Sequence, residues 1–308
     1  MNIGIVGAGG IGSYYAGTLT RAGHQVRLVA RGEHLAAMRE RGLEVRTIGD
    51  SFVVRPDVSD DGALVQDCEF VLVSVKSYSL SEVGPSLVGA ATRGATVIPL
   101  LNGADVAERL IALGVPSPAI VGGIVHASLV RIEPGVVQRR SPGDRVTIGE
   151  FDRASSERTS RIVDALTGAG STASLSADIN RDIWRKFGLI VPMGIVCGLA
   201  RQPMGPVLAS DAGRGLLTRS LHEVALVGRA VAGKLDEVDE AAVRDDLFGI
   251  GPSIKPSFLL DLERGGPTEL DLLAGTVRRL GREHGVPTPI AEIAVAAFEV
   301  AANGSMAV

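Results

Sequence analysis

The sequence is poor in cysteine, in basic charge and in long apolar runs, and each shortage excludes a class of protein. Its two cysteines, Cys68 and Cys197, form no metal-binding or disulfide spacing, so we expect no metal site and a reducing, cytoplasmic environment. Acidic residues (35) outnumber lysine and arginine (31), and the net charge of −4 argues against a nucleic-acid partner. No segment approaches the ~18 uninterrupted apolar residues of a membrane span, and the N-terminal residues lack the basic segment of a secretory signal. With 45% hydrophobic and 21% charged residues, a soluble globular protein remains.

The 308 residues exceed what one hydrophobic core usually organises, and the sequence pattern changes near residue 175. Before that point, short β-branched runs alternate with helical stretches, which is typical of βαβ units and a parallel sheet. The expected strands are 3–7, 26–30, 70–75, 97–101 and 120–130, with a hairpin or edge pair at 43–46 and 52–56 and an antiparallel edge addition at 136–139 and 145–149. Helical spacing then prevails in 178–200, 204–233, 239–248, 254–264, 268–284 and 289–302. We therefore predict a doubly wound α/β domain over 1–175 and an all-helical domain over 176–308.

The segment GAGGIG, residues 7–12, fits the pattern G-x-G-x-x-G directly after a predicted strand and at the start of a predicted helix. In this pattern the first glycine permits a tight turn, the second lets a pyrophosphate approach the backbone, and the third allows close helix–strand packing. The N–H groups at the start of the helix suit the phosphates. The predicted dinucleotide-binding residues are Gly7, Ala8, Gly9, Gly10, Ile11 and Gly12. The alternative is a glycine-rich turn without a ligand, and Gly4 and Gly10 are also explained by packing alone.

The end of the second predicted strand favours NADPH over NADH. An acidic residue at this point would hold the ribose 2′-hydroxyl of NAD, whereas here the strand VRLVA runs into Arg31, and no carboxylate follows until Glu33. A guanidinium suits a 2′-phosphate because it is planar, charged and bidentate. Lys76, which ends FVLVSVK, is expected at the same cofactor crevice. The alternatives are a solvated loop charge for Arg31 and a surface lysine at a strand end for Lys76.

A nicotinamide carries out the hydride chemistry itself, so the protein must supply a proton donor and a substrate clamp. The candidate donor is Lys186, which on the helix of DIWRKFGLIVPMG shares an apolar face with Ile183 and Ile190. Desolvation on such a face lowers the pKa of an amine toward the range that a general acid near neutrality needs. The alternative is a lysine whose stem only covers apolar surface.

Three further polar residues are candidates for the clamp or for the proton donor's support. Asn102, at the end of a predicted strand, could hydrogen-bond a carbonyl or hydroxyl, but Asn-Gly is also a plain turn signal. Glu269 lies at the start of a predicted helix, where Thr268 and Asp271 resemble a capping box and the helix dipole alone favours an acidic residue. Ser257 could be a hydroxyl ligand or simply the first residue of a helix.

In this order, the motifs resemble those of the ketopantoate reductase (2-dehydropantoate 2-reductase) family along the whole chain. They are GAGGIG, Arg31, VSVK ending at Lys76, NG at 102–103, GGIVHAS around His126, WRK at 184–186, and S-x-x-x-D followed by T-E-x-D within 257–271. The resemblance implies an NADP-binding Rossmann domain joined to a helical domain of the 6-phosphogluconate dehydrogenase C-terminal type. It also implies NADPH-dependent reduction of a 2-oxo acid to a 2-hydroxy acid, of the 2-dehydropantoate-to-pantoate type that serves pantothenate biosynthesis.

The resemblance further implies a role for each candidate residue. Lys186 and Glu269 would be catalytic, as the proton donor and the carboxylate that orients it. Asn102 would contact both cofactor and substrate, and Ser257 would bind the substrate carboxylate. Two basic residues would surround the adenosine phosphate of the cofactor: Arg31 and Lys76.

Three positions depart from the family's pattern. Ile190 and Gly194, four and eight residues beyond the lysine, and Ile254, three before the serine, stand where well-studied members carry asparagines. A buried polar group of the substrate that loses such an amide is left unpaired, at about 1–3 kcal/mol each. The alternatives are therefore a relative that reduces a less polar ketone, or a catalytically idle NADP-binding protein. We also expect a homodimer, since segment 204–233 could bury a dimer surface as well as a core.

Overall fold

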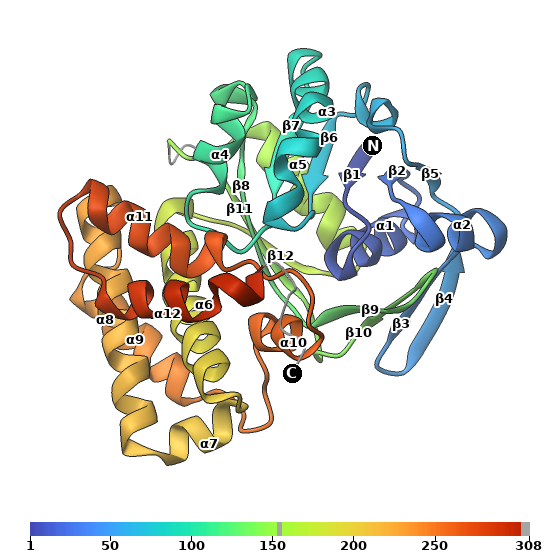
Figure 1. The fold of residues 1–308 in the computed structure, drawn as a ribbon. Helices are drawn as coiled ribbons and strands as arrows, with labels where there is room; N and C mark the ends of the chain where they lie inside the picture. The colour runs from blue at the N-terminus through green and yellow to red at the C-terminus, as the bar shows by residue number, and fades with distance from the viewer. Residues whose placement is uncertain (153–155, 303–308) are drawn as a thin grey trace. The chain divides into compact units, whose positions relative to one another are not determined.

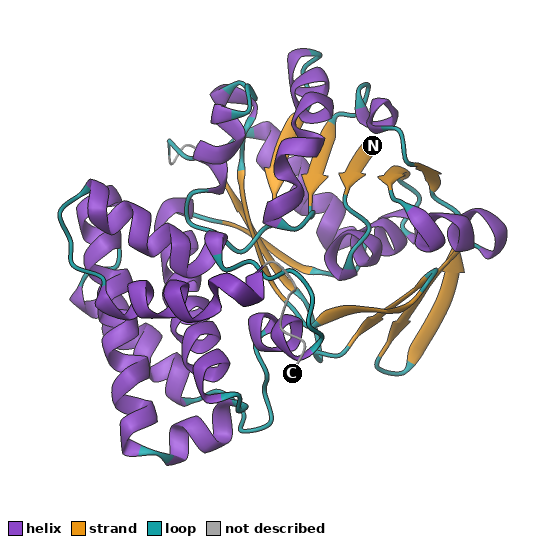
Figure 2. Cartoon of the chain, in the orientation of Figure 1, coloured by secondary structure: helices purple, strands orange, loops and turns teal. Residues whose placement is uncertain are grey.

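The chain forms two compact units in a computed structural model that describes residues 1–152 and 156–302. Unit 1 comprises Met1–Leu101 and Val106–Ile179. Unit 2 comprises the short segment Asn102–Asp105 and the chain from Asn180 onward. Among the described residues every strand lies in unit 1, and unit 2 is helical (Figure 2). The predicted fold class, a doubly wound parallel sheet followed by a helical domain, is confirmed.

The centre of unit 1 is a five-stranded sheet with the order β5-β2-β1-β6-β7, in which every pairing is parallel. Its strands are β1 (Asn2–Val6), β2 (Gln25–Val29), β5 (Asp57–Ser59), β6 (Phe70–Val73) and β7 (Thr96–Pro99). The strands β6 and β7 are buried along their whole length, as expected for strands covered on both faces. The chain order reverses direction at β1, which is the point where sheets of this kind bind ligands.

Two smaller sheets complete the strands of unit 1. The first has the order β4-β3-β10-β9, with β3 (Leu43–Thr47), β4 (Asp50–Val54), β9 (Leu129–Glu133) and β10 (Val136–Arg139). The second has the order β12-β11-β8, with β8 (Gly122–His126), β11 (Arg145–Gly149) and β12 (Thr172–Leu175). The predicted hairpin is confirmed, because β3 and β4 pair antiparallel.

Two strand predictions are wrong. The expected strand 120–130 breaks after His126, and its two parts, β8 and β9, enter different sheets. The expected edge addition at 136–139 and 145–149 is also split, since β10 and β11 belong to different sheets. The turn between them is held inward rather than forming a tight hairpin. Its residue Asp144 is buried and accepts hydrogen bonds from the hydroxyls of Tyr14 (2.9 Å) and Tyr15 (3.2 Å).

In the described part of unit 1, five helices and three 3-10 turns connect these strands. They are α1 (Gly10–Arg21), α2 (Gly32–Arg41), α3 (Leu80–Thr92), α4 (Val106–Ala112), α5 (Glu157–Gly168), η1 (Gly62–Val65), η2 (Ser77–Ser79) and η3 (Ser117–Ala119). Helix α1 contacts both the five-stranded and the four-stranded sheet. Its residues 12–19 are all buried, which is the pattern of a helix covered on every side.

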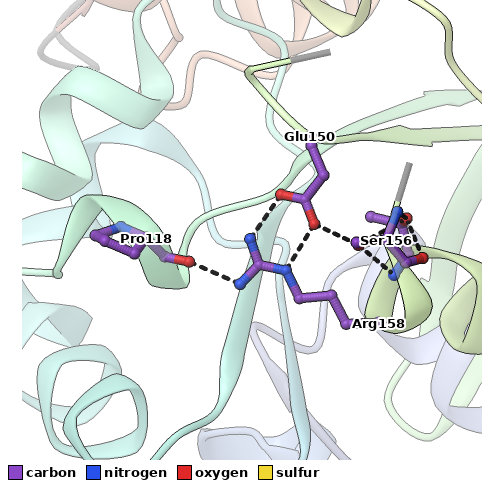
Figure 3. A network of polar contacts seen from close by, with 5 residues as sticks. Pro118, Glu150, Ser156 and Arg158 are labelled. Carbon is purple, nitrogen blue, oxygen red and sulfur yellow. Dashed lines mark hydrogen bonds and ion pairs between the residues drawn. The ribbon is translucent and has the colours of Figure 1, made fainter. Parts of the chain in front are cut away.

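A polar network fixes the start of α5 (Figure 3). The guanidinium of Arg158 donates to both carboxylate oxygens of Glu150 (2.7 and 2.6 Å) and to the carbonyl oxygen of Pro118 (2.7 Å). Ser156, the N-cap of α5, donates to Glu150 (2.6 Å). Burial opposes ionisation of Glu150, but these charge-assisted bonds outweigh it and lower the pKa of the carboxyl.

Unit 2 is built from helices, drawn from yellow to red in Figure 1. They are α6 (Ile179–Ala200), α7 (Met204–Ala209), α8 (Asp211–Ala232), α9 (Glu237–Phe248), α10 (Ser257–Glu263), a π-helical turn η4 (Asp271–Gly275), α11 (Thr276–Glu283) and α12 (Pro289–Ala302). Helix α6 is long and apolar enough to cross a membrane by length and composition alone. Its apolar window is 56% buried inside the protein, and Phe187, Val191 and Ile195 belong to the core of unit 2.

Candidate active site

In unit 1, the glycine turn joins β1 to α1 and is closed by backbone contacts. Gly7 has a φ of +105°, and a Cβ at Gly7 would lie 2.6 Å from the backbone nitrogen of Val75. A Cβ at Gly12 would lie 1.9 Å from the carbonyl oxygen of Gly7. A Cβ at Gly10 would lie 2.1 Å from the carbonyl oxygen of Leu129, so packing against the start of β9 requires glycine at that position. The turn therefore tolerates no side chain at these three positions.

Gly9 lies in a different environment. A Cβ at Gly9 would meet only the carbonyl oxygen of Ser74, at 4.0 Å, so the space in front of it is open. Gly9 is the N-cap of the 12-residue helix α1, and as a glycine it provides no side-chain cap for the first N–H groups. The first turn of α1 contains no acidic residue, and Ala8 and Ile11 beside it are only half-buried. The first N–H groups of a helix have no partner within the helix, so an N-terminus with open space at its N-cap fits a dinucleotide pyrophosphate.

The two predicted basic residues of the cofactor site follow strands that flank β1. Arg31 follows β2, directly before α2, and pairs with Glu82 in the first turn of α3. Both side chains are 55% exposed, so this pair is open to solvent. Lys76 follows β6, directly before η2, and is half-buried. Because parallel strands end at one edge of a sheet, both residues and the glycine turn lie at the edge where doubly wound sheets bind nucleotides.

Unit 2 contains a pocket with about 390 Å³ of space, part of it open to solvent. Its polar lining consists of Asn102, Ser257, Asp261 and Glu269. Its apolar lining consists of Ile190, Met193, Gly194, Pro256, Phe258 and Leu273. Three residues singled out from the sequence, about 170 positions apart at the extremes, thus line one pocket: Asn102, Ser257 and Glu269.

Lys186 lies one helical turn before Ile190 on α6 and reaches the pocket through Asn102. Its Nζ donates a hydrogen bond to Asn102 Oδ1 at 2.7 Å. Burial lowers the pKa of the Lys186 amine to about 8, while the negative charge of Glu269 acts in the opposite direction. The amine is therefore bonded inside unit 2 instead of extending into solvent. Its pKa lies close to neutrality, as a general acid requires.

Glu269 precedes an irregular helix start, and the capping box predicted around it is wrong. The helix begins as the π-helical turn η4 at Asp271, in which the N–H of Gly275 donates to the carbonyl of Leu270, five residues earlier, at 2.9 Å. Among the described residues, the buried hydroxyl of Thr268 finds no hydrogen-bond partner. Glu269 itself is 8% exposed and lines the pocket, which a role as a solvated partner of the helix dipole does not explain. Such π turns are frequent at functional sites.

Two of the three departures from the family's pattern lie in the pocket. Ile190 and Gly194 line it, whereas Ile254 is absent from the lining and is 46% exposed. The argument that an apolar residue replaces a substrate-binding amide therefore applies to two positions only. Asp261 is the aspartate of the motif S-x-x-x-D, to which the sequence assigned no role, and it lines the pocket. Four residues after Ser257, it lies on the same face of α10.

The apolar wall of the pocket was missed from the sequence. Met193, Phe258 and Leu273 fall at positions with helical spacing, where burial in a core is the default expectation. Phe258 and Leu273 do belong to the core of unit 2, and Met193 packs against it, so these side chains line the pocket from the edge of the core. The helical pattern alone does not separate a side chain that faces a cavity from one that faces another helix.

Comparisons with known proteins cover both units. Two family models match the chain, ketopantoate reductase PanE/ApbA over residues 3–153 and ketopantoate reductase PanE/ApbA C terminal over residues 178–301. A 2-dehydropantoate 2-reductase of Halobacterium salinarum is 30% identical and aligns with 94% of this chain and 95% of its own. The crystal structure of a PanE/ApbA family ketopantoate reductase from Ralstonia eutropha JMP134 matches with a TM-score of 0.88 at 26% identity, covering 98% of both chains. A D-mandelate dehydrogenase solved with NADH and anilino(oxo)acetate shares the fold, with a TM-score of 0.87 at 22% identity over 98% of both chains.

Proposed function

This chain belongs to the ketopantoate reductase family, and we propose that it is an NADPH-dependent reductase that converts a 2-oxo acid into a 2-hydroxy acid, of the 2-dehydropantoate-to-pantoate type. The observation that carries the proposal is the Lys186 amine, which is partly buried, has a lowered pKa and is bonded to an amide that lines a pocket. General acids of this kind serve carbonyl reduction, because the oxygen must gain a proton as the carbon gains a hydride.

The glycine turn and the basic residues of unit 1 fit NADPH. The open N-terminus of α1 at Gly9 would hold the pyrophosphate. Arg31 would bind the 2′-phosphate, releasing Glu82 to solvent, and Lys76 would lie near the same end of the cofactor. When bound, NADPH supplies the hydride from its nicotinamide to the carbonyl carbon of the substrate and leaves as NADP⁺.

Lys186 supplies the proton in the same reaction. Its Nζ donates the proton to the carbonyl oxygen, which becomes the hydroxyl of the product as the amine becomes neutral. The oxygen of Asn102 holds one N–H of the ammonium and so aims another toward the pocket. The charge of Glu269 favours the protonated amine against the effect of burial, so the acid is charged before the reaction begins.

The remaining lining residues select the substrate. The hydroxyl of Ser257 would donate to the substrate carboxylate. Ile190 and Gly194 offer no hydrogen bond to a polar substituent, and together with Met193 and Phe258 they favour an apolar one. This apolar lining supports a second candidate, a relative that prefers a 2-oxo acid or ketone with an apolar substituent. A protein named D-mandelate dehydrogenase, after an aryl 2-hydroxy acid, has the same fold.

The test is NADPH oxidation against a panel that contains 2-dehydropantoate, benzoylformate and a branched aliphatic 2-oxo acid. Lys186→Ala should lower kcat on the best substrate about 10²–10⁴-fold, while the Kd for NADPH, followed by its fluorescence, stays unchanged. Unchanged turnover in this variant would refute the assignment of the proton donor. Ile190→Asn should raise the relative turnover of 2-dehydropantoate if the apolar wall sets the preference. An idle binding protein would bind NADPH and oxidise it with no member of the panel.

Three expectations stay predictions. The partner is a small-molecule keto acid or ketone, and the homodimer would bury part of the surface of α7 and α8, which form most of segment 204–233. The third is a cytoplasmic location, which fits the family.

A further inference from the structure

Asp105 is a buried carboxylate close to the pocket that the mechanism above does not use. It is 3% exposed and ends the four-residue segment Asn102–Asp105, the part of the first half of the chain that clusters with unit 2. Its Oδ1 accepts a hydrogen bond from the hydroxyl of Thr276 at 3.2 Å, and its Oδ2 accepts one from the guanidinium of Arg279 at 2.6 Å. Thr276 is fully buried, and both partners lie on α11.

The two segments joined by these bonds lead to residues that act on the proposed proton donor, Lys186. Helix α11 continues from η4, and η4 follows Glu269. The hydroxyl of Thr276 also approaches the carbonyl of Asp271 at the start of η4, at 3.3 Å. At the other end of the segment, Asn102 accepts the hydrogen bond from Lys186 on α6. Asp105 therefore connects the segment that bears Asn102 to helix α11, which follows Glu269 and η4 in the chain.

The segment is short enough for this connection to matter. Three residues span at most about 10 Å when fully extended, so a fixed Asp105 confines Asn102 to a small volume. Ala104, between them, packs against the core of unit 2. Asn102 is followed by Gly103, and such a flexible Asn-Gly pair would by itself allow the Asn102 side chain many orientations. The observed bond of 2.7 Å to Lys186 needs a constraint from elsewhere, and Asp105 supplies one.

We propose that Asp105 is a positioning residue, which anchors segment 102–105 to η4 and α11 and thereby holds the Asn102 oxygen against the Lys186 amine. Its meaning for catalysis rests on the proposed function, whereas the anchor itself is a property of unit 2. A simpler role is available, because Asp105 directly precedes α4 and could serve only as its cap. The test must separate an anchor from a cap.

The decisive measurement is the pH dependence of Lys186 acetylation by acetic anhydride, followed by peptide mass spectrometry on the protein without cofactor. The chain has four lysines, so Lys186 is resolved readily, and the exposed Lys255 serves as an internal reference. Loss of an acceptor that favours the charged amine lowers its titration midpoint. Asp105→Ala should lower the midpoint by roughly half a unit to one unit. Asp105→Asn, which keeps an oxygen to accept the hydrogen bond from Thr276, should leave the midpoint close to its value in the native chain.

Arg279 distinguishes the anchor from the cap. Arg279→Ala leaves Asp105 in place before α4 but removes its guanidinium partner, so an anchor predicts a smaller shift in the same direction. The matched control is Glu283→Ala, which removes the exposed carboxylate that also pairs with Arg279 (3.0 Å) and should leave the midpoint unchanged. A shift with Asp105→Ala but none with Arg279→Ala would overturn the proposal. So would an unchanged or raised midpoint with Asp105→Ala.

Turnover measurements then connect the anchor to the reaction. In the same variants the alkaline limit of kcat should move with the acetylation midpoint, while KM for NADPH stays the same. If Asp105→Ala fails to fold, Arg279→Ala carries the test, because its side chain is 45% exposed. The two proposals fail separately. A midpoint shift in a protein that reduces no carbonyl would refute the proposed function but support the anchor. An unchanged midpoint in an active enzyme would refute the anchor alone.

Discussion

The bond between Lys186 and Asn102 makes a quantitative prediction about the pH dependence of turnover. Asn102→Ala removes an acceptor 2.7 Å from the Nζ of Lys186 and leaves the helix that buries the amine unchanged. A hydrogen bond to a charged group contributes about 1.5–3 kcal/mol, and one pKa unit corresponds to about 1.4 kcal/mol. The pKa of Lys186, about 8 in the native chain, should therefore fall by about 1 to 2 units in the variant.

The sign of the effect on the rate follows from the proposed role of the amine as a general acid. A general acid acts in its protonated form, so kcat/KM declines as pH rises through the pKa of the free enzyme. At pH 7.5 an amine of pKa about 8 is roughly 0.76 protonated. One of pKa about 6.5 is roughly 0.09 protonated, so protonation alone costs about eightfold in rate. The assay is NADPH oxidation from pH 5.5 to 9.5 with the best substrate of the panel.

A second variant at the same position should act in the opposite direction. Asn102→Asp places a carboxylate beside the ammonium, which favours the charged form and moves the decline of kcat/KM to higher pH. A general loss of structure would lower the rate at every pH in both variants without separating their midpoints. If the two midpoints move together, or if neither moves, the link between Asn102 and the proton donor is refuted.

Three further predictions concern unit 1. Glu82→Ala frees Arg31 from an exposed ion pair worth about 0.2–1 kcal/mol, so the Kd for NADPH should fall by up to about fivefold while that for NADH is unchanged; equal changes for both would contradict the role of Arg31. Gly9→Ala should leave the unfolding temperature unchanged but weaken NADPH binding. Gly12→Ala, whose Cβ would lie 1.9 Å from a backbone oxygen, should lower both the unfolding temperature and the affinity for NADPH. Matching effects of the two variants would contradict the open space at Gly9. Arg158→Ala leaves the half-buried carboxylate of Glu150 in Figure 3 without its guanidinium but with the hydroxyl of Ser156. It should destabilise unit 1 by about 1–3 kcal/mol in a denaturant titration. An unchanged midpoint would show that solvent replaces the guanidinium.

The parts of the fold that the sequence predicted are those set by local patterns. The strands β6 and β7 are short, mostly apolar runs with several β-branched residues, and a strand covered on both faces needs little more than that. The strands β1 and β2 are also short and rich in valine and isoleucine. The glycine turn was also predictable, because G-x-G-x-x-G restricts what the backbone can do. In each case the residues that decide the conformation lie within a few positions of one another.

The parts that were missed depend on contacts between distant residues. The turn before β11 is held inward because Asp144 receives the hydroxyls of Tyr14 and Tyr15, some 130 positions earlier. No pattern around Asp144 announces that contact, and an exposed turn was the natural expectation. The capping box at Thr268 failed for a related reason, since the packing of η4 inserts a π turn where the local sequence favours an ordinary helix start.

The residues of the candidate site were predicted one by one from the sequence, but the contacts between them were not. On its own, the lysine of WRK is more simply explained as a charge that reaches solvent, and only a family resemblance favoured Lys186 as a proton donor. The structure adds the bond to Asn102 and the desolvation that lowers the pKa. Neither is visible in a sequence, because the two residues lie 84 positions apart.

The composition of α6 connects these observations. This helix is the segment of the described chain that comes nearest to a membrane span, and its apolar residues are buried in the core of unit 2 instead. Lys186 lies near its N-terminal end, so the same apolar packing that stabilises the unit also takes the amine out of water. A polar residue introduced next to Lys186 on α6 would thus act on two properties at once, weakening the core and raising the pKa of the acid. For that reason the pKa of the proposed proton donor should be adjusted through Asn102 and Glu269, which act on the amine from outside the helix, more readily than through α6 itself.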